Sequence, residues 1–256
     1  MAQTIWIGNI HFKDTDIPVK LHTSVTQKRI QFHLLHKTDR IRLRQQMICA
    51  YEKIPVTGAE EVKGFKVDER KYILMDSEEL EETEPEKNRM IEVHEFVKAG
   101  EIDPVFMERT YYLEPGMANN KNYGLLVDIL KDTGLQGICT WAMRKRAYFG
   151  AVKSDGKMLR LTTLRYADEI IKVKDLGIEA FSLSEKELEI AGELIGKLTV
   201  HFQPEKYKNE HQQKLQELIE KKARGEKLVL LKPRKRKTTP SGKLLEVLEE
   251  SLRMAR

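Results

Sequence analysis

Three arginines, each separated from the next by one apolar residue, stand in the first quarter of the sequence: Arg40, Arg42 and Arg44. On a β-strand this spacing places the three guanidinium groups on one face, ~6.6 Å apart at a rise of ~3.3 Å per residue. A guanidinium fork can donate two parallel hydrogen bonds to a phosphate, so such a row can follow a nucleic-acid backbone. Lys37 and Lys53 nearby favour this interpretation, although a solvated strand face has the same spacing.

Two further basic groups have the same chemistry. Arg144, Lys145 and Arg146 form a predicted hairpin tip, for which a solvated turn is the alternative. A basic run near the C-terminus is a stronger electrostatic signal, and it contains Lys232, Arg234, Lys235, Arg236 and Lys237. A nuclear localisation signal has the same composition. Phosphate contacts of this kind give affinity without a choice of base sequence, and they weaken steeply with salt.

Signatures of catalysis are missing from the sequence. It contains no G-x-x-x-x-G-K-[ST] loop, no G-x-S-x-G elbow and no H-E-x-x-H pair. His33 and His36 are three positions apart, which puts them on opposite faces of a strand, and Cys49 has Glu52 where a C-x-x-C pair would need a second thiol. We therefore expect a protein that is not an enzyme and that has no metal site and no cofactor. The acidic residues between 76 and 86 are expected to form a solvated loop or helix.

The elements that must position the basic groups are mostly strands. Alternating side chains predict strands at 30–36 and 89–98, and a three-strand meander at 138–144, 147–153 and 158–164. Asp155-Gly156 is a hairpin signal in the second turn of that meander. One helix is expected at about 120–133, ending before Gly134. Short strands separated by turns favour a barrel or a sandwich, in a mainly β fold with added helices (α+β).

The pattern changes near residue 184, where Ser184 and Glu187 form a capping box. The helix that follows carries an apolar stripe, and a second helix is expected to start at Pro204 and to end near Gly225. Such stripes must be buried against the body or against a second subunit. The stripe residues of this helical arm are Leu188, Ala191, Leu194, Ile195 and Leu198 on the first helix and Leu215, Leu218 and Ile219 on the second.

We therefore predict three parts: a β-rich core at 1–183, a helical arm at 184–225, and a basic linker with a short terminal helix at 226–256. The 45 basic and 40 acidic residues give a formal charge of only +5, so the placement of charge matters more than its sum. Two distant cysteines fit a reducing compartment. The start of the chain lacks the pattern of a secretion signal, and no apolar run approaches the ~20 residues that span a membrane. We expect a cytoplasmic, nucleoid-associated protein with no membrane partner.

Seven stretches along the chain make it resemble the bacterial Ku family from about residue 2 to residue 225, in the order and spacing of that family. They are IWIGNIHF with IPVKLHT, FHLLHKTDRIR, EEVKGFKV, EIDPVFMERTYYLEP, TLRYADEI, SEKELEIAGELI and FQPEKYKNEHQQKLQELIEKKARGE.

The resemblance implies a β-barrel core with an extended bridge, and a homodimer whose two bridges close a ring around a DNA duplex. It also implies a helical arm that embraces the partner subunit, and non-sequence-specific binding of double-stranded DNA ends in non-homologous end joining. The ATP-dependent DNA ligase D would be recruited through the C-terminal region, and the basic tail would add affinity for DNA.

Two other functions stay open. A metal-dependent nuclease would need acids at metal-binding spacing beside the basic face, and none is evident in the sequence. A nucleoid architectural protein would bind closed circles and linear fragments equally, through a basic surface such as the run at 232–237.

Overall fold

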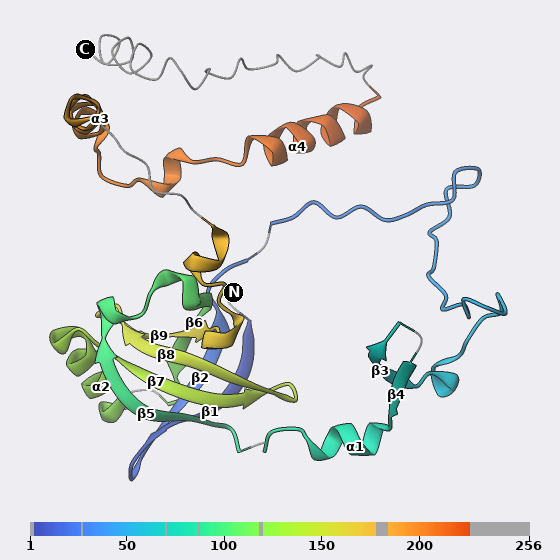
Figure 1. Ribbon diagram of the computed structural model, residues 1–256, viewed down its shortest axis with the longest axis horizontal. Coiled ribbons are helices and arrows are strands. Elements are labelled where there is room, and N and C mark those ends of the chain that lie inside the picture. The colour runs from blue at the N-terminus through green and yellow to red at the C-terminus, as the bar shows by residue number, and fades with distance from the viewer. Residues whose placement is uncertain are drawn as a thin grey trace. The chain divides into compact units, whose positions relative to one another are not determined.

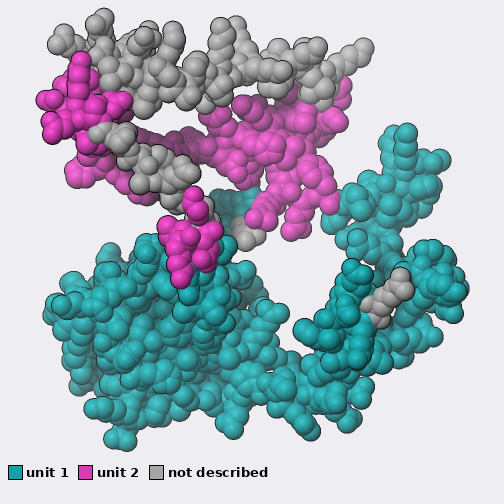
Figure 2. Space-filling model, viewed as in Figure 1, with its two compact units in different colours: residues 1–28, 33–172 teal, residues 29–32, 173–256 magenta. Residues whose placement is uncertain are grey.

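The computed structural model describes residues 3–26, 28–69, 71–86, 88–117, 120–177 and 184–225. The chain divides into two compact units (Figure 2). The first contains Met1–Lys28 and His33–Lys172, and the second contains Arg29–Phe32 and Val173–Arg256. The predicted basic run at 232–237 and the predicted terminal helix lie outside the described residues. The predicted domain limits at 183 and 225 stay a prediction.

The first unit is built on a closed, seven-stranded β-barrel, which confirms the predicted mainly β fold with helices (Figure 1). Around the barrel the strand order is β1-β2-β6-β9-β8-β7-β5. The strands are β1 (Thr4–Phe12), β2 (Thr15–Thr23), β5 (Met90–Lys98), β6 (Met107–Pro115), β7 (Leu135–Met143), β8 (Arg146–Ser154) and β9 (Leu159–Leu164). Every neighbouring pair is antiparallel except β1 and β5.

The parallel pairing of β1 with β5 closes the barrel, and it is short. It joins Asn9 to Met90, Ile10 to Ile91 and His11 to Glu92. Beside it, the amide of Asn9 donates to the carbonyl of Arg89 over 3.0 Å. A Cβ added at Gly8 would lie 2.2 Å from that same carbonyl oxygen. Glycine at position 8 therefore allows the two strands to approach each other and complete the barrel.

The barrel interior is filled by alternating apolar side chains, of which Ile10, Leu21, Leu113 and Leu161 are fully buried. Helix α2 (Lys121–Thr133) packs on β7 and β8 and adds Tyr123, Leu126, Val127 and Leu130 to this core. The Tyr123 hydroxyl donates to the carbonyl of Leu113 and accepts from the amide of Leu159 at 3.0 Å, so it connects two strands. Burial raises the pKa of this phenol.

Several predicted elements are confirmed. The strand expected at 89–98 is β5, and the meander is β7, β8 and β9. Helix α2 begins after the N-cap Asn120 and ends at Gly134, whose φ of 65° is the left-handed conformation that glycine adopts without strain. At the second hairpin, Gly156 has a φ of 86°, and the Asp155 carboxylate accepts the amides of Lys157 and Met158. These contacts, with a lesser contribution from Arg160, lower the pKa of Asp155 to about 2.

Between β2 and β5 the chain leaves the barrel for an excursion, which we define as residues 24–89. It contains the 3₁₀ turn η1 (Gly58–Glu60), the two-stranded hairpin of β3 (Lys63–Asp68) and β4 (Lys71–Met75), and the helix α1 (Ser77–Glu82). None of its described residues is buried. Residues 30–36 form no strand, so that prediction is wrong: Leu35 makes a single bridge to Arg42, and no sheet of the described chain includes the segment.

Short 3₁₀ turns occupy several connections of the remaining chain: η2 (Ala99–Glu101), η3 (Pro104–Phe106), η4 (Ala167–Glu169) and η5 (Val173–Leu176). In the second unit, α3 (Glu185–Leu198) starts at the predicted capping box, where the Ser184 amide donates to Glu187 over 2.8 Å. The predicted helix start at Pro204 is wrong. Pro204–Lys206 is a single 3₁₀ turn, and α4 (Glu210–Ala223) starts after Asn209, whose side chain accepts the amide of Gln212.

Among the helices that the structure describes, none is long and apolar enough to cross a membrane.

The replacement Gly8→Ala tests the closure of the barrel. The new methyl group would meet the Arg89 carbonyl, and we expect the free energy of unfolding to fall by about 1–3 kcal/mol or more, as overpacked sites do. Urea denaturation at fixed protein concentration measures this change. Gly100→Ala is the matched control, because a Cβ there meets nothing within 4 Å. Equal stability of the two variants would contradict the role of Gly8.

Candidate nucleic-acid interface

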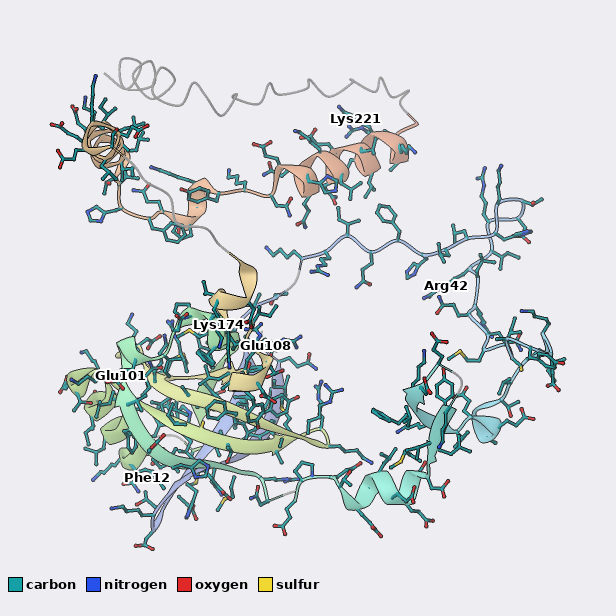
Figure 3. The ribbon with its side chains drawn as sticks, viewed as in Figure 1. Phe12, Arg42, Glu101, Glu108, Lys174 and Lys221 are labelled. Carbon is teal, nitrogen blue, oxygen red and sulfur yellow. The ribbon has the colours of Figure 1, made fainter. Side chains whose placement is uncertain are left out.

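The five basic residues predicted around position 40 all lie on the excursion, and all are exposed: Lys37, Arg40, Arg42, Arg44 and Lys53. Figure 3 shows Arg42 on the excursion, which we also call the limb. The predicted row of three guanidinium groups on one strand face is wrong. Arg40 has a φ of 61° and ends the loop that reverses the chain, and Arg42 lies in an isolated bridge to Leu35. The structure therefore brings these cations onto one limb but does not align them as a strand would.

The basic tip is the two-residue turn between β7 and β8, as predicted. Met143 pairs with Arg146 across the turn, and the two residues between them, Arg144 and Lys145, have φ values of 52° and 64°. Two successive positive φ angles define a type I′ turn, which usually contains Asn or Gly. This turn therefore holds two long cationic side chains in a backbone conformation that L residues seldom adopt.

Lys145 is held by carboxylates of the excursion. Its ammonium lies 2.7 Å from Glu84 Oε1 and 3.3 Å from Glu81 Oε1, at and beside the end of α1. The hydrogen bond to Glu84, and after it the one to Glu81, raises the pKa of Lys145. The acidic segment predicted to be solvated is therefore only partly so. Two of its carboxylates, those of Glu81 and Glu84, form ion pairs with Lys145 at the tip of the barrel. Phosphates would have to compete with these carboxylates for Lys145.

Arg144, the other residue of the turn, lines an open cavity of about 610 Å³. The cavity wall also contains Ser24, Tyr148, Glu108 and Arg109, and the Arg109 Nε lies 3.7 Å from Glu108 Oε1. Sequence reasoning missed Arg109 because it follows an acidic residue and has no basic neighbour. The fold alone brings it to the same cavity as the tip.

Metal ions have no evident place in the part of the chain that the structure describes, since no three His, Cys, Asp or Glu side chains gather there as a ligand set. The Cys49 thiol is half-buried, and hydrogen bonds from the amides of Glu52 and then Tyr51 lower its pKa. Cys139 is enclosed in the barrel, where burial raises its pKa to about 12.

The stripe on α3 is not covered within its own unit. Leu188, Ile195 and Leu198 are 55%, 66% and 63% exposed, whereas Leu194 is half-buried. On α4, the predicted stripe residues Leu215 and Leu218 are half-buried, and neither helix has a buried residue. Two amphipathic helices with so little burial need a further surface to cover them.

Comparisons with known proteins find relatives over nearly the whole chain. Residues 11–190 match the family model described as the Ku70/Ku80 beta-barrel domain. The chain is 60% identical over 250 residues to the non-homologous end joining protein Ku 2 of Geotalea uraniireducens, covering 98% of this chain and 97% of that protein. It is 39% identical to the non-homologous end joining protein Ku of an Anaeromyxobacter species, over 88% and 77% of the two chains. It is also 32% identical to that of Solibacter usitatus, over 100% and 95%.

The replacement Glu84→Gln tests the contact at the tip. Removing the nearer carboxylate charge should lower the pKa of Lys145, so that a larger fraction of its amine is unprotonated. We expect Lys145 to react faster with an acylating reagent, as mass spectrometry of digested protein would show. Glu82→Gln is the control, because no ion pair joins Glu82 to Lys145 in the described chain. An unchanged rate in Glu84→Gln would show that the ion pair does not persist in solution.

Proposed function

The chain belongs to the Ku family of non-homologous end joining proteins, and on that basis we propose that it binds the ends of double-stranded DNA without sequence preference and without catalysing a reaction. The family membership supports end binding, and the described surface supports a backbone contact. Its exposed cations are arginines and lysines on a limb and at turn tips, which is the chemistry of phosphate binding.

The observation that carries the proposal is the excursion itself. It leaves the barrel after β2 and returns at β5, and none of its described residues between these strands is buried. A segment of this length that covers no core does not stabilise the barrel. A limb fixed to the barrel at both ends and carrying exposed cations can instead lie along a duplex.

We further propose that a second copy of the chain completes the binding site, as a homodimeric ring. The support is the apolar surface that the excursion leaves uncovered. The β3–β4 hairpin alone exposes Phe65, Tyr72, Ile73 and Leu74 by half or more, and an isolated two-stranded hairpin is marginally stable in water. A second copy of the chain that covers these side chains and the stripe on α3 would stabilise the hairpin and the helix. A ring threads only onto a free end, so its topology would supply the selectivity that base contacts do not.

DNA ligase D is the proposed enzymatic partner, recruited through the C-terminal region, and the basic residues at 232–237 would add DNA affinity. Both proposals rest on the family resemblance and on the composition of that region. The same composition keeps the nucleoid architectural function as the alternative, and a protein of that kind would bind DNA from the side rather than from an end.

Binding to a linear duplex and to the same duplex closed into a covalent circle separates these functions. At about 0.15 M salt we expect tight binding to the linear form and only nonspecific affinity for the circle, roughly 10⁻⁴ to 10⁻⁶ M. Cutting the circle at one site is the control, and it should restore tight binding. Equal affinity for circle and linear form would reject end threading and favour the architectural function.

The replacement Ile195→Asp tests the arm. Ile195 is 66% exposed in the single chain, and a buried, unpaired carboxylate at an interface would be strongly unfavourable. We expect sedimentation to show monomers, and binding to linear DNA to weaken as the dimer dissociates. Lys186→Asp introduces the same side chain on the same helix away from the stripe, and it should leave a dimer. A dimeric Ile195→Asp variant would contradict the assignment of α3.

A further inference from the structure

The excursion contains two consecutive hairpins with one hydrogen-bond pattern, which we call the twin hairpins: residues 34–43 and 47–56. Three backbone hydrogen bonds hold the first hairpin. The amide of His36 donates to the carbonyl of Ile41 (2.8 Å), that of Arg40 to His36 (2.9 Å) and that of Leu43 to Leu34 (2.9 Å).

The second hairpin repeats these bonds 13 positions later in the chain. The amide of Cys49 donates to the carbonyl of Ile54 (2.9 Å), that of Lys53 to Cys49 (3.0 Å) and that of Val56 to Met47 (3.0 Å).

The single β-bridges of the two hairpins correspond as well. Leu35 pairs with Arg42 in the first hairpin, and Ile48 pairs with Pro55 in the second. The twin hairpins are therefore two copies of one local structure, although their sequences differ.

Both copies place a cation at the same strained position. Arg40 and Lys53 close the two four-residue loops, and each has a φ of 61°. Asn and Asp are enriched at such positions, because their short side chains can hydrogen-bond locally, which a long cationic side chain does not reproduce. Throughout the described chain, every non-glycine residue with positive φ is Lys or Arg; the others are Lys13, Arg89, Arg144 and Lys145. Positive φ alone therefore does not single out Arg40 and Lys53; what distinguishes them is that each occupies the same position in one of the twin hairpins.

The two cations are available to a ligand. Both are exposed, and no ion pair is found for either one among the residues that the structure describes. The acid nearest in sequence to Arg40 is engaged elsewhere: Asp39 Oδ1 accepts the amide of Ile41 over 2.9 Å and lies 3.0 Å from His36 Nδ1. These contacts lower the pKa of Asp39, so it remains an anion bound to its own turn. Lys145, held by two carboxylates, is the contrasting case.

We propose that the twin hairpins are a duplicated phosphate-contact unit, in which Arg40 and Lys53 each bind one phosphate of a nucleic-acid backbone. This inference rests on the proposed function and assigns its contacts. Two equivalent units with one cation each suit a ligand that repeats its charge, and duplex DNA carries one negative charge per ~1.7 Å of its axis. Contacts to phosphates carry no information about the base sequence, so this unit would bind DNA without a base preference.

The test replaces each cation with Asn, which accepts the left-handed conformation and removes the charge. For the dimer on linear duplex, log K is measured against log salt for Arg40→Asn, Lys53→Asn and the double variant. One phosphate contact contributes ~0.9 to the slope. In the proposed homodimer each single replacement removes two contacts, so the slope should become about 1.8 less steep, and the double variant should show twice that change. The melting temperature should not fall, and Arg40→Lys should keep the wild-type slope.

Lys13→Asn is the matched control, because it removes a cation from a left-handed position in the β1–β2 turn, outside the twin hairpins. We expect its slope to equal that of the wild type. A change as large as that of Arg40→Asn would overturn the assignment, since removal of any cation would then have the same effect. Failure of the wild type to bind DNA would overturn the proposed function as well, whereas intact binding with unchanged slopes in both hairpin variants would overturn this inference alone.

Discussion

The rest of the structure depends on the short parallel contact between β1 and β5. It converts a sheet of antiparallel strands into a closed barrel without edges, which removes the unpaired backbone groups that an open sheet exposes. The contact is possible because Gly8 leaves room for the carbonyl of Arg89. The same contact fixes the returning end of the excursion, so the closure of the barrel also determines where the limb proposed to bind DNA is attached.

Stability is distributed unevenly as a consequence. The barrel and α2 contain the buried core, whereas the excursion has no buried residue in its described part and exposes many apolar side chains. Local stability follows buried contacts, so the limb should gain most from anything that binds it. A second copy or a DNA duplex that binds the ordered limb would stabilise it by mass action. Assembly and DNA binding would then be linked through the same segment.

The charged side chains of this protein occupy specific positions that its small net charge does not reveal. Cations stand at the left-handed positions of turns, and an acidic segment neutralises one of them through Glu81 and Glu84. Exposed ion pairs of this kind are weak, which lets a polyanion exchange with them. A surface with many weak phosphate contacts can hold a duplex and still allow it to slide, as the proposed threading onto a DNA end would require.

The sequence by itself determined the elements whose signals are local. The capping box at Ser184, the glycine after α2, the Asp155-Gly156 turn and the meander all follow from nearest-neighbour chemistry, and the seven stretches identified the family. Only the tertiary structure decided the rest. An alternating pattern at 30–36 made no strand because no neighbouring strand of the described chain pairs with it, and the true start of α4 depended on the cap at Asn209 rather than on Pro204. Lys145 pairs with Glu84, which is distant in sequence, and Arg40 and Lys53 occupy equivalent positions; both relations exist only in the folded chain.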